Sequence, residues 1–193
     1  MPSLSEEDRK AILELARQGV QHAVCHERPL STFPTTGIFM ERRGLFVTLH
    51  VAKKLRGCIG VIEGSAALGE TLVRCAADAA LHDPRFSRMR AEELSALEIE
   101  VSLLTPPEPI RLEEVEIGVH GLLVERGTRR GLLLPQVAVE HRLGREQFLG
   151  ETCAKAGLPR EAWMDPETKL YGFQCEILAE ATGPLAAKQS PRQ

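Results

Sequence analysis

The residues best suited to chemistry lie in one hexapeptide, Leu55-Arg56-Gly57-Cys58-Ile59-Gly60. If this segment is a β-strand, its two-residue period places Arg56, Cys58 and Gly60 on one face. A guanidinium two positions from a thiol favours the thiolate, which is the nucleophilic form of cysteine. Gly57 and Gly60 carry no side chains and let a ligand approach the backbone. The pattern therefore fits an activated cysteine or an anion pocket.

A structural interpretation of the same hexapeptide stays open. Cysteine is often a small buried core residue, and glycines in strands often mark bulges or close packing. In that interpretation Cys58 has no solvent access and Arg56 points to the far side of the sheet. The sequence alone does not separate the two interpretations.

Two further segments offer polar side chains. Asp83-Pro84-Arg85-Phe86 forms a polar turn after a helix, in which Asp83 and Arg85 either bind a ligand or hold the helix end through local hydrogen bonds. Glu100 lies on the non-core face of the segment 97–104, where it either lines a cleft or is solvated. If it shares a cleft with Cys58, it is the candidate acid/base residue, with Cys58 as nucleophile or redox group and Arg56 holding an anionic substrate.

The sequence contains no recognisable cofactor or metal motif. His22 and His26 share a helix face, but two histidines do not make a metal site, and the other histidines have no ligand spacing. A phosphate-binding glycine loop and a Gly-x-Ser-x-Gly elbow are also missing. We therefore expect no metal, and the identity of any cofactor stays open.

Hydrophobic periodicity predicts the elements of the first half. A helix is expected from Ser5 to about residue 24, with Ser5 as its cap. A hairpin is expected over residues 37–51, followed by a strand at 55–62. A second helix is expected from Ser65 to about residue 81, and a strict alternation of apolar and polar residues predicts a strand at 97–104.

The second half repeats this pattern weakly. Residues 121–134 resemble residues 37–46 and predict a second hairpin, and helices and a last strand at 170–179 follow. Chance similarity between two hairpins remains the alternative. We expect an α+β fold with one continuous core, a single domain over residues 1–180, and a disordered tail over residues 181–193.

Composition excludes several classes of function. The net charge is −3 and only 4% of the residues are aromatic, which argues against a nucleic-acid-binding protein. No apolar run approaches the roughly 20 residues of a membrane span, and the first residues lack the pattern of a signal peptide. The five cysteines are widely spaced, which argues against disulfides and favours a reduced, cytoplasmic location.

At the hexapeptide 55–60 the sequence resembles the AMMECR domain family, whose hallmark is Leu-Arg-Gly-Cys-Ile-Gly. Five further blocks resemble that family in the same order and extend the likeness to roughly residues 10–180: 46–49, 83–86, 99–104, 131–138 and 153–158. Ser87 departs from the family, which usually places proline there.

The resemblance implies a mixed, barrel-like sheet built from two related strand-rich halves, with flanking helices, two unequal lobes and a cleft. It adds Gln136 to Asp83 and Glu100 as candidates for the polar rim of a ligand site. It also implies Memo-like and radical SAM proteins as partners. No firm biochemical activity attaches to the family, so an enzyme acting on a small anionic molecule and a non-catalytic binding module both remain open.

Overall fold

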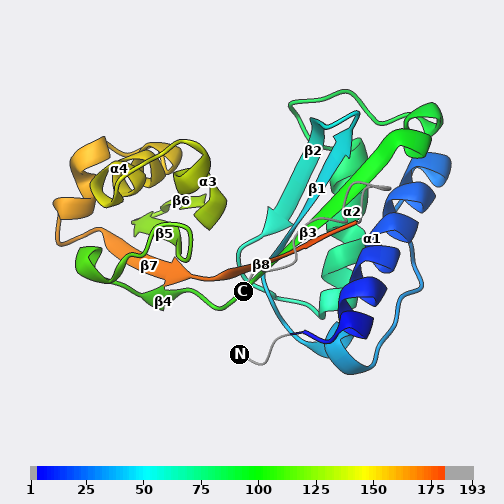
Figure 1. Cartoon of the computed structure of the whole chain (residues 1–193), viewed down its shortest axis with the longest axis horizontal. Coiled ribbons are helices and arrows are strands. Elements are labelled where there is room, and N and C mark those ends of the chain that lie inside the picture. The colour runs from blue at the N-terminus through cyan, green and yellow to red at the C-terminus, as the bar shows by residue number, and fades with distance from the viewer. Residues whose placement is uncertain (1–3, 181–193) are drawn as a thin grey trace, which may run out of the picture. The chain divides into compact units, whose positions relative to one another are not determined.

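The computed structural model describes residues 4–180, and Figure 1 shows the order of their elements. These residues divide into two compact units: unit 1 contains residues 4–103 and 177–180, and unit 2 contains residues 104–176. Each unit has its own buried hydrophobic residues. One domain over residues 1–180 therefore stays a prediction, and the expected tail at 181–193 lies outside the described residues.

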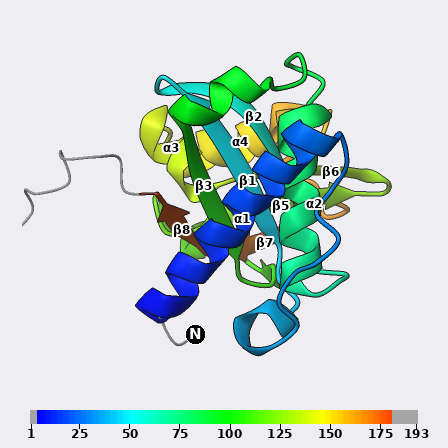
Figure 2. The ribbon, with the colours of Figure 1, turned by 90° about the vertical axis from the view of Figure 1, so that its right-hand side faces the viewer.

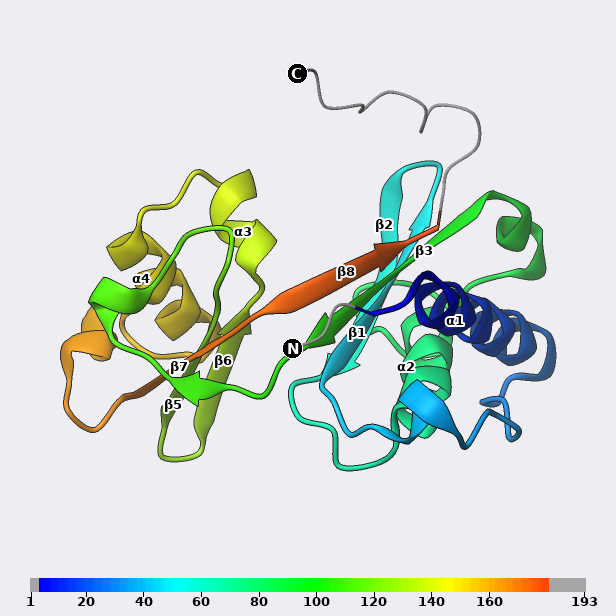
Figure 3. The same cartoon turned by 60° about the horizontal axis from the view of Figure 1, so that its bottom comes forward.

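Two helices cover one face of the sheet in unit 1 (Figures 2 and 3). Helix α1 (Glu6–His26) begins as expected, because the side chain of Ser5 accepts a hydrogen bond from the backbone N–H of Asp8. Helix α2 (Leu68–Leu81) begins two residues later than a cap at Ser65 would place it. The prediction that Ser65 caps α2 is wrong, because the backbone N–H of Leu68 is instead bound by the carbonyl of Glu41.

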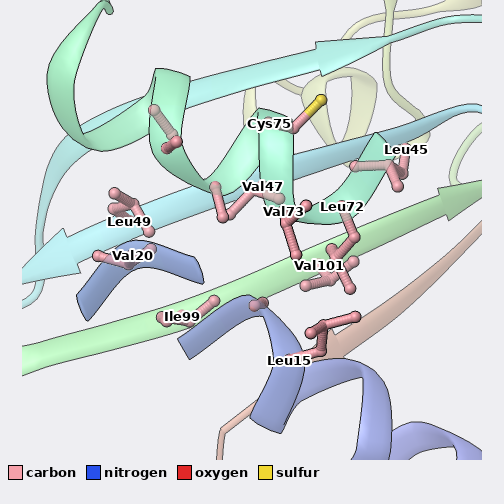
Figure 4. Packing of buried hydrophobic residues seen from close by; sticks show 14 of the residues in the cluster. Leu15, Val20, Leu45, Val47, Leu49, Leu72, Val73, Cys75, Ile99 and Val101 are labelled. Carbon is pink, nitrogen blue, oxygen red and sulfur yellow. The ribbon is translucent and has the colours of Figure 1, made fainter. Parts of the chain in front are cut away.

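The sheet of unit 1 has the order β2-β1-β3-β8. Its strands are β1 (Leu45–Val51), β2 (Lys54–Val61), β3 (Leu97–Leu104) and β8 (Cys175–Ala179). Alternate residues of β1 and β3, such as Val47 and Val101, are buried against α1 and α2 (Figure 4). The intervening residues of these strands therefore lie on the face that carries neither α1 nor α2.

The hairpin predicted over residues 37–51 is wrong. Residues Gly37–Met40 form a short 3₁₀ helix, η1, whose Phe39 is buried in the core. Strand β1 pairs instead with β2 through a two-residue turn, Ala52-Lys53, in which both residues have positive φ as a type I′ turn requires. Residues 37–46 and 121–133 are therefore not two equivalent hairpins.

Unit 2 contains the sheet β4-β7-β5-β6. Its strands are β4 (Glu108–Pro109), β5 (Gly121–Arg126), β6 (Arg129–Leu133) and β7 (Lys169–Phe173). The second predicted hairpin is confirmed, since β5 and β6 pair antiparallel. The helices are α3 (Pro135–Glu140) and α4 (Arg145–Lys155), and further 3₁₀ turns of the chain are η2 (Ala91–Ala96), η3 (Leu112–Glu114) and η4 (Arg160–Met164).

The α+β class and the two strand-rich halves are confirmed. The strands of residues 4–180 form two four-stranded sheets, however, and not the single barrel-like sheet that was expected. Pro106 and Pro107 follow β3 and lack the N–H groups that would continue its pairing. The strand predicted at 170–179 is likewise split at Gln174, so that β7 belongs to one sheet and β8 to the other.

None of the helices within residues 4–180 combines the length and apolar character that a membrane span needs.

Candidate functional site

The hallmark hexapeptide occupies most of β2, which is an edge strand of its sheet. Its pairing with β1 shifts register between Leu49 and His50: Leu49 pairs with Gly57, whereas His50 pairs with Leu55. Arg56 is thus the extra residue of a β-bulge, and bulges redirect the side chain of the inserted residue. The two-residue period that placed Arg56 beside Cys58 does not hold across this bulge.

The guanidinium of Arg56 is fully engaged with the loop that precedes β3. Its Nε lies 2.7 Å from Oε1 of Glu93 and its Nη2 lies 3.1 Å from Oε2, while Nη1 donates to the carbonyl of Ser87 at 2.8 Å. Only 15% of the Arg56 side chain is exposed. The hydrogen bond from Arg56 is the main cause that lowers the pKa of Glu93. Arg56 therefore fastens β2 to this loop, and Ser87 contributes a carbonyl to the arrangement.

Replacing Arg56 with alanine is expected to lower the free energy of unfolding by about 2–3 kcal/mol, because Glu93 and the backbone carbonyls of Ser87 and Arg88 lose charge-assisted donors in a half-buried place. Urea denaturation measures this change. Arg88→Ala is the matched control, since the Arg88 side chain is 63% exposed and its ion pair with Glu27 spans 3.5 Å. Equal small effects of the two substitutions would contradict the fastening role.

Asp83 and Arg85 close the free edge of β2 at Cys58. The backbone N–H of Cys58 donates to Oδ2 of Asp83 at 2.8 Å, and Nη2 of Arg85 donates to the carbonyl of Cys58 at 3.1 Å. The two side chains thereby supply the acceptor and the donor that a neighbouring strand would supply. The turn 83–86 was predicted to bind a ligand or to hold local hydrogen bonds. Local hydrogen bonds from Arg85 to Asp83 are present, and the bonds to Cys58 are long-range ones that were not predicted.

The same carboxylate fixes the guanidinium of Arg85. Nε and Nη2 of Arg85 lie 3.0 and 2.7 Å from the two oxygens of Asp83, whose side chain is 2% exposed. The hydrogen bond from Arg85, together with those from two backbone N–H groups, holds the pKa of the Asp83 carboxyl well below its usual range. Arg85 itself is 54% exposed. Its guanidinium carbon lies 5.5 Å from the ring centroid of Phe86. Its Nη1 has no hydrogen-bond partner among residues 4–180, so one donor group of the Asp83-paired guanidinium remains available at the surface.

The thiol of Cys58 is partly exposed on the face of the sheet opposite α1 and α2. It accepts a hydrogen bond from the hydroxyl of Thr48 at 3.3 Å. The pKa of Arg85 is raised chiefly by its hydrogen bond to Asp83. The basic side chain that contacts Cys58 is therefore Arg85, through the Cys58 carbonyl, and not Arg56.

Glu100 reaches the same face from the third strand. Thr48 of β1 pairs with Cys58 on one side and with Glu100 on the other, so Cys58, Thr48 and Glu100 form one row across β2, β1 and β3. Glu100 is half-buried. Cys58 and Glu100 thus lie on one face of the sheet, two strands apart, and their membership of a common site with Arg85 stays a prediction.

Both glycines of the hexapeptide are required by packing. A Cβ atom on Gly57 would overlap the backbone carbonyl of Ala79 in α2, and a Cβ on Gly60 would overlap the ring of Phe46. The space that the sequence prediction left for a ligand at Gly57 and Gly60 is therefore filled by a helix on one face and an aromatic ring on the other.

Gln136 lies on α3 of unit 2, where its Oε1 is buried and makes no hydrogen bond within residues 4–180. Its membership of the Cys58 site stays a prediction.

Nothing in the sequence indicated that Thr48 donates a hydrogen bond to the thiol of Cys58. Counting back from the two-residue turn would pair Thr48 with Gly57, and only the bulge at Arg56 brings it opposite Cys58.

Pockets occur elsewhere on both units. One of about 500 Å³ lies between α1 and β8, and two of about 470 and 460 Å³ flank α4. Cys58 lines none of these three. No group of three or more acidic, cysteine or histidine side chains within residues 4–180 is arranged to hold a metal ion.

The chain is an α+β protein in which the edge strand β2 carries Cys58. The turn that contains Asp83 and Arg85 binds the free backbone groups of this cysteine. The AMMECR1 family model matches residues 13–178, and the chain belongs to this family. A protein of Methanothermobacter thermautotrophicus is 43% identical over 185 residues, which cover 92% of this chain and 96% of that protein. One of Thermococcus gammatolerans is 42% identical over 205 residues, covering 97% and 98%. The crystal structure of uncharacterised protein PH0010 from Pyrococcus horikoshii matches with a TM-score of 0.84 and 38% identity, covering 92% and 94% of the two chains.

Proposed function

We propose that unit 1 carries a thiol site in which Cys58 acts as nucleophile or redox group on a small anionic molecule. The observation that carries this proposal is the placement of Arg85. Its guanidinium is held by the buried carboxylate of Asp83 beside a partly exposed thiol, and Nη1 has no partner among the described residues. A guanidinium fixed in this way binds carboxylate or phosphate without losing further side-chain freedom.

The proposal gives each neighbouring residue one role. Arg85 contacts the negative group of the substrate. Thr48 orients the sulfur through its hydroxyl. Glu100, two strands away in the same row, is the acid/base residue. Arg56 keeps β2 in place through Glu93 and does not contact the substrate.

Two alkylating reagents of similar size test this proposal. In both reactions the cysteine sulfur displaces iodide, but iodoacetate carries a carboxylate and iodoacetamide is neutral. The exposed Cys25 serves as a reference within the same chain. The ratio of the iodoacetate rate to the iodoacetamide rate is expected to be about tenfold higher at Cys58 than at Cys25, as one charge-assisted contact implies. Peptide mass spectrometry follows each cysteine separately. Equal ratios at the two cysteines would refute an anion site.

A non-catalytic binding module is the second candidate. It is favoured by an exposed apolar side chain, because the neighbouring Leu55 is 42% exposed on the edge strand. In this alternative the face docks a protein partner, for which Memo-like and radical SAM proteins are the proposed candidates. Cys58→Ser separates the two, since a docking module keeps its partner after this substitution whereas an enzyme loses its activity.

A further inference from the structure

Unit 2 contains a pocket that the proposed thiol site of unit 1 does not use. It has a volume of about 470 Å³ and lies between α4 and η4, which pack against each other. A pocket of this volume is large enough for a small-molecule ligand. Its lining combines accessible apolar side chains with charged ones, namely Trp163 and Met164 with Glu146, Glu151, Arg160 and Glu161.

The apolar part of this pocket includes the only tryptophan of the chain. The Trp163 side chain packs in part against the buried residues of unit 2, and its accessible part lines the pocket. Met164, the next residue, is 61% exposed. Ligand pockets are usually floored by such apolar and aromatic side chains. An aromatic ring also attracts a cation, and tryptophan does so more strongly than phenylalanine or tyrosine.

The charged part of the pocket carries a surplus of negative charge. Arg160 forms an ion pair with Glu151, so these two charges compensate each other. Within residues 4–180, the carboxylates of Glu146 and Glu161 have neither an ion pair nor a hydrogen bond. Each lies in the first turn of a helix, where a carboxylate is favourable by itself, but a helix end does not require an accessible aromatic side chain beside it. The pocket therefore presents two uncompensated negative charges next to an apolar floor.

We propose that this pocket binds an aliphatic diamine, a molecule in which a short methylene chain joins two ammonium groups. The ammonium groups pair with Glu146 and Glu161, and the methylene chain packs against Trp163 and Met164. Each ammonium group gains a charge-assisted contact with a carboxylate, and the tryptophan ring adds cation–π attraction. The site lies within unit 2 and does not depend on Cys58.

The fluorescence of Trp163 reports on this pocket directly, because the chain contains no other tryptophan. Putrescine is the probe, butylamine has the same carbon chain with a single ammonium group, and magnesium chloride supplies a compact dication without an apolar chain. Putrescine is expected to change the fluorescence saturably, with half of the change reached below about 1 mM. Butylamine is expected to bind about fivefold more weakly, since one charge-assisted contact is lost. Magnesium is expected to cause no saturable change over the same range.

Two substitutions test the roles of the carboxylates. Glu146→Gln and Glu161→Gln are each expected to weaken putrescine binding about fivefold. Each should change butylamine binding by less than about twofold, because a single ammonium group still has the other carboxylate as a partner. Glu140→Gln is the matched control, since Glu140 is an exposed residue of the same unit that lines none of the three pockets.

Any one of three results would overturn the assignment. The first is a wild-type protein whose fluorescence does not change saturably with putrescine. The second is a response to magnesium of the same size at the same concentration, which would indicate a general effect of positive charge. The third is a loss of putrescine affinity in Glu140→Gln as large as in the two pocket variants.

Discussion

Replacing Gly57 with alanine is expected to lower the free energy of unfolding by about 3–5 kcal/mol. The added Cβ would overlap the backbone carbonyl of Ala79, and a helix backbone cannot move aside as a flexible side chain can. Strand β2 or helix α2 must therefore shift, and both pack on the same core. Urea denaturation followed by circular dichroism measures the loss.

Gly37→Ala is the control for this substitution within the same unit. Nothing lies within 4 Å of a Cβ on Gly37, whose φ is +56°, so only backbone strain of about 1 kcal/mol is expected. A loss for Gly57→Ala no larger than that for Gly37→Ala would show that β2 does not need the close approach of α2.

Asp83→Asn is expected to lower the free energy of unfolding by about 3–4 kcal/mol. The side chain is buried, and its two oxygens accept hydrogen bonds from the backbone of Cys58 and from the backbone and guanidinium of Arg85. An asparagine places an NH₂ group against one of these donors and removes the negative charge. Because Arg85 is then released, the preference of Cys58 for iodoacetate is expected to disappear in the same variant.

The stability contributed by Asp83 depends on pH with a definite sign. Its folded-state pKa is depressed, first by the hydrogen bond from Arg85, relative to an unfolded value of about 3.9. Its contribution is therefore present above about pH 5 and is lost as the pH falls through about 4 toward the folded pKa. The Asp83→Asn protein should lose less stability than the wild type over this range. Asp78→Asn, at a side chain that is 37% exposed, should not change the acid response in this way.

The sequence predicted the regular elements well because their hydrophobic periods are strong. The alternation of residues 97–104 placed β3, and the cap at Ser5 placed the start of α1. The hairpin at 37–51 failed because Ala52-Lys53 does not resemble a type I′ turn, which usually contains asparagine and glycine. Residues 37–40 are apolar and therefore suggested a strand. They form a 3₁₀ turn instead, from which the side chain of Phe39 packs into the core.

The candidate site was located by its residues, but its contacts were not predictable. Strand period placed Arg56 beside Cys58, and a single inserted residue in the register removed that relation. The side chains and carbonyls that bind Arg56, and the Asp83 and Arg85 groups that bind the backbone of Cys58, lie 25 to 37 positions away along the chain, so no local pattern reveals them. The glycines were interpreted as openings because the sequence does not show which helix or ring packs against them.

The most direct measurement of the central claim compares Arg85→Ala with Arg88→Ala. Both substitutions remove one positive charge from the same exposed loop, but only Arg85 contacts Cys58. The ratio of iodoacetate to iodoacetamide rates at Cys58 is expected to fall about tenfold in Arg85→Ala and to remain at the wild-type value in Arg88→Ala. An unchanged ratio in Arg85→Ala, or an equal fall in both variants, would contradict a thiol site that recognises anions through Arg85.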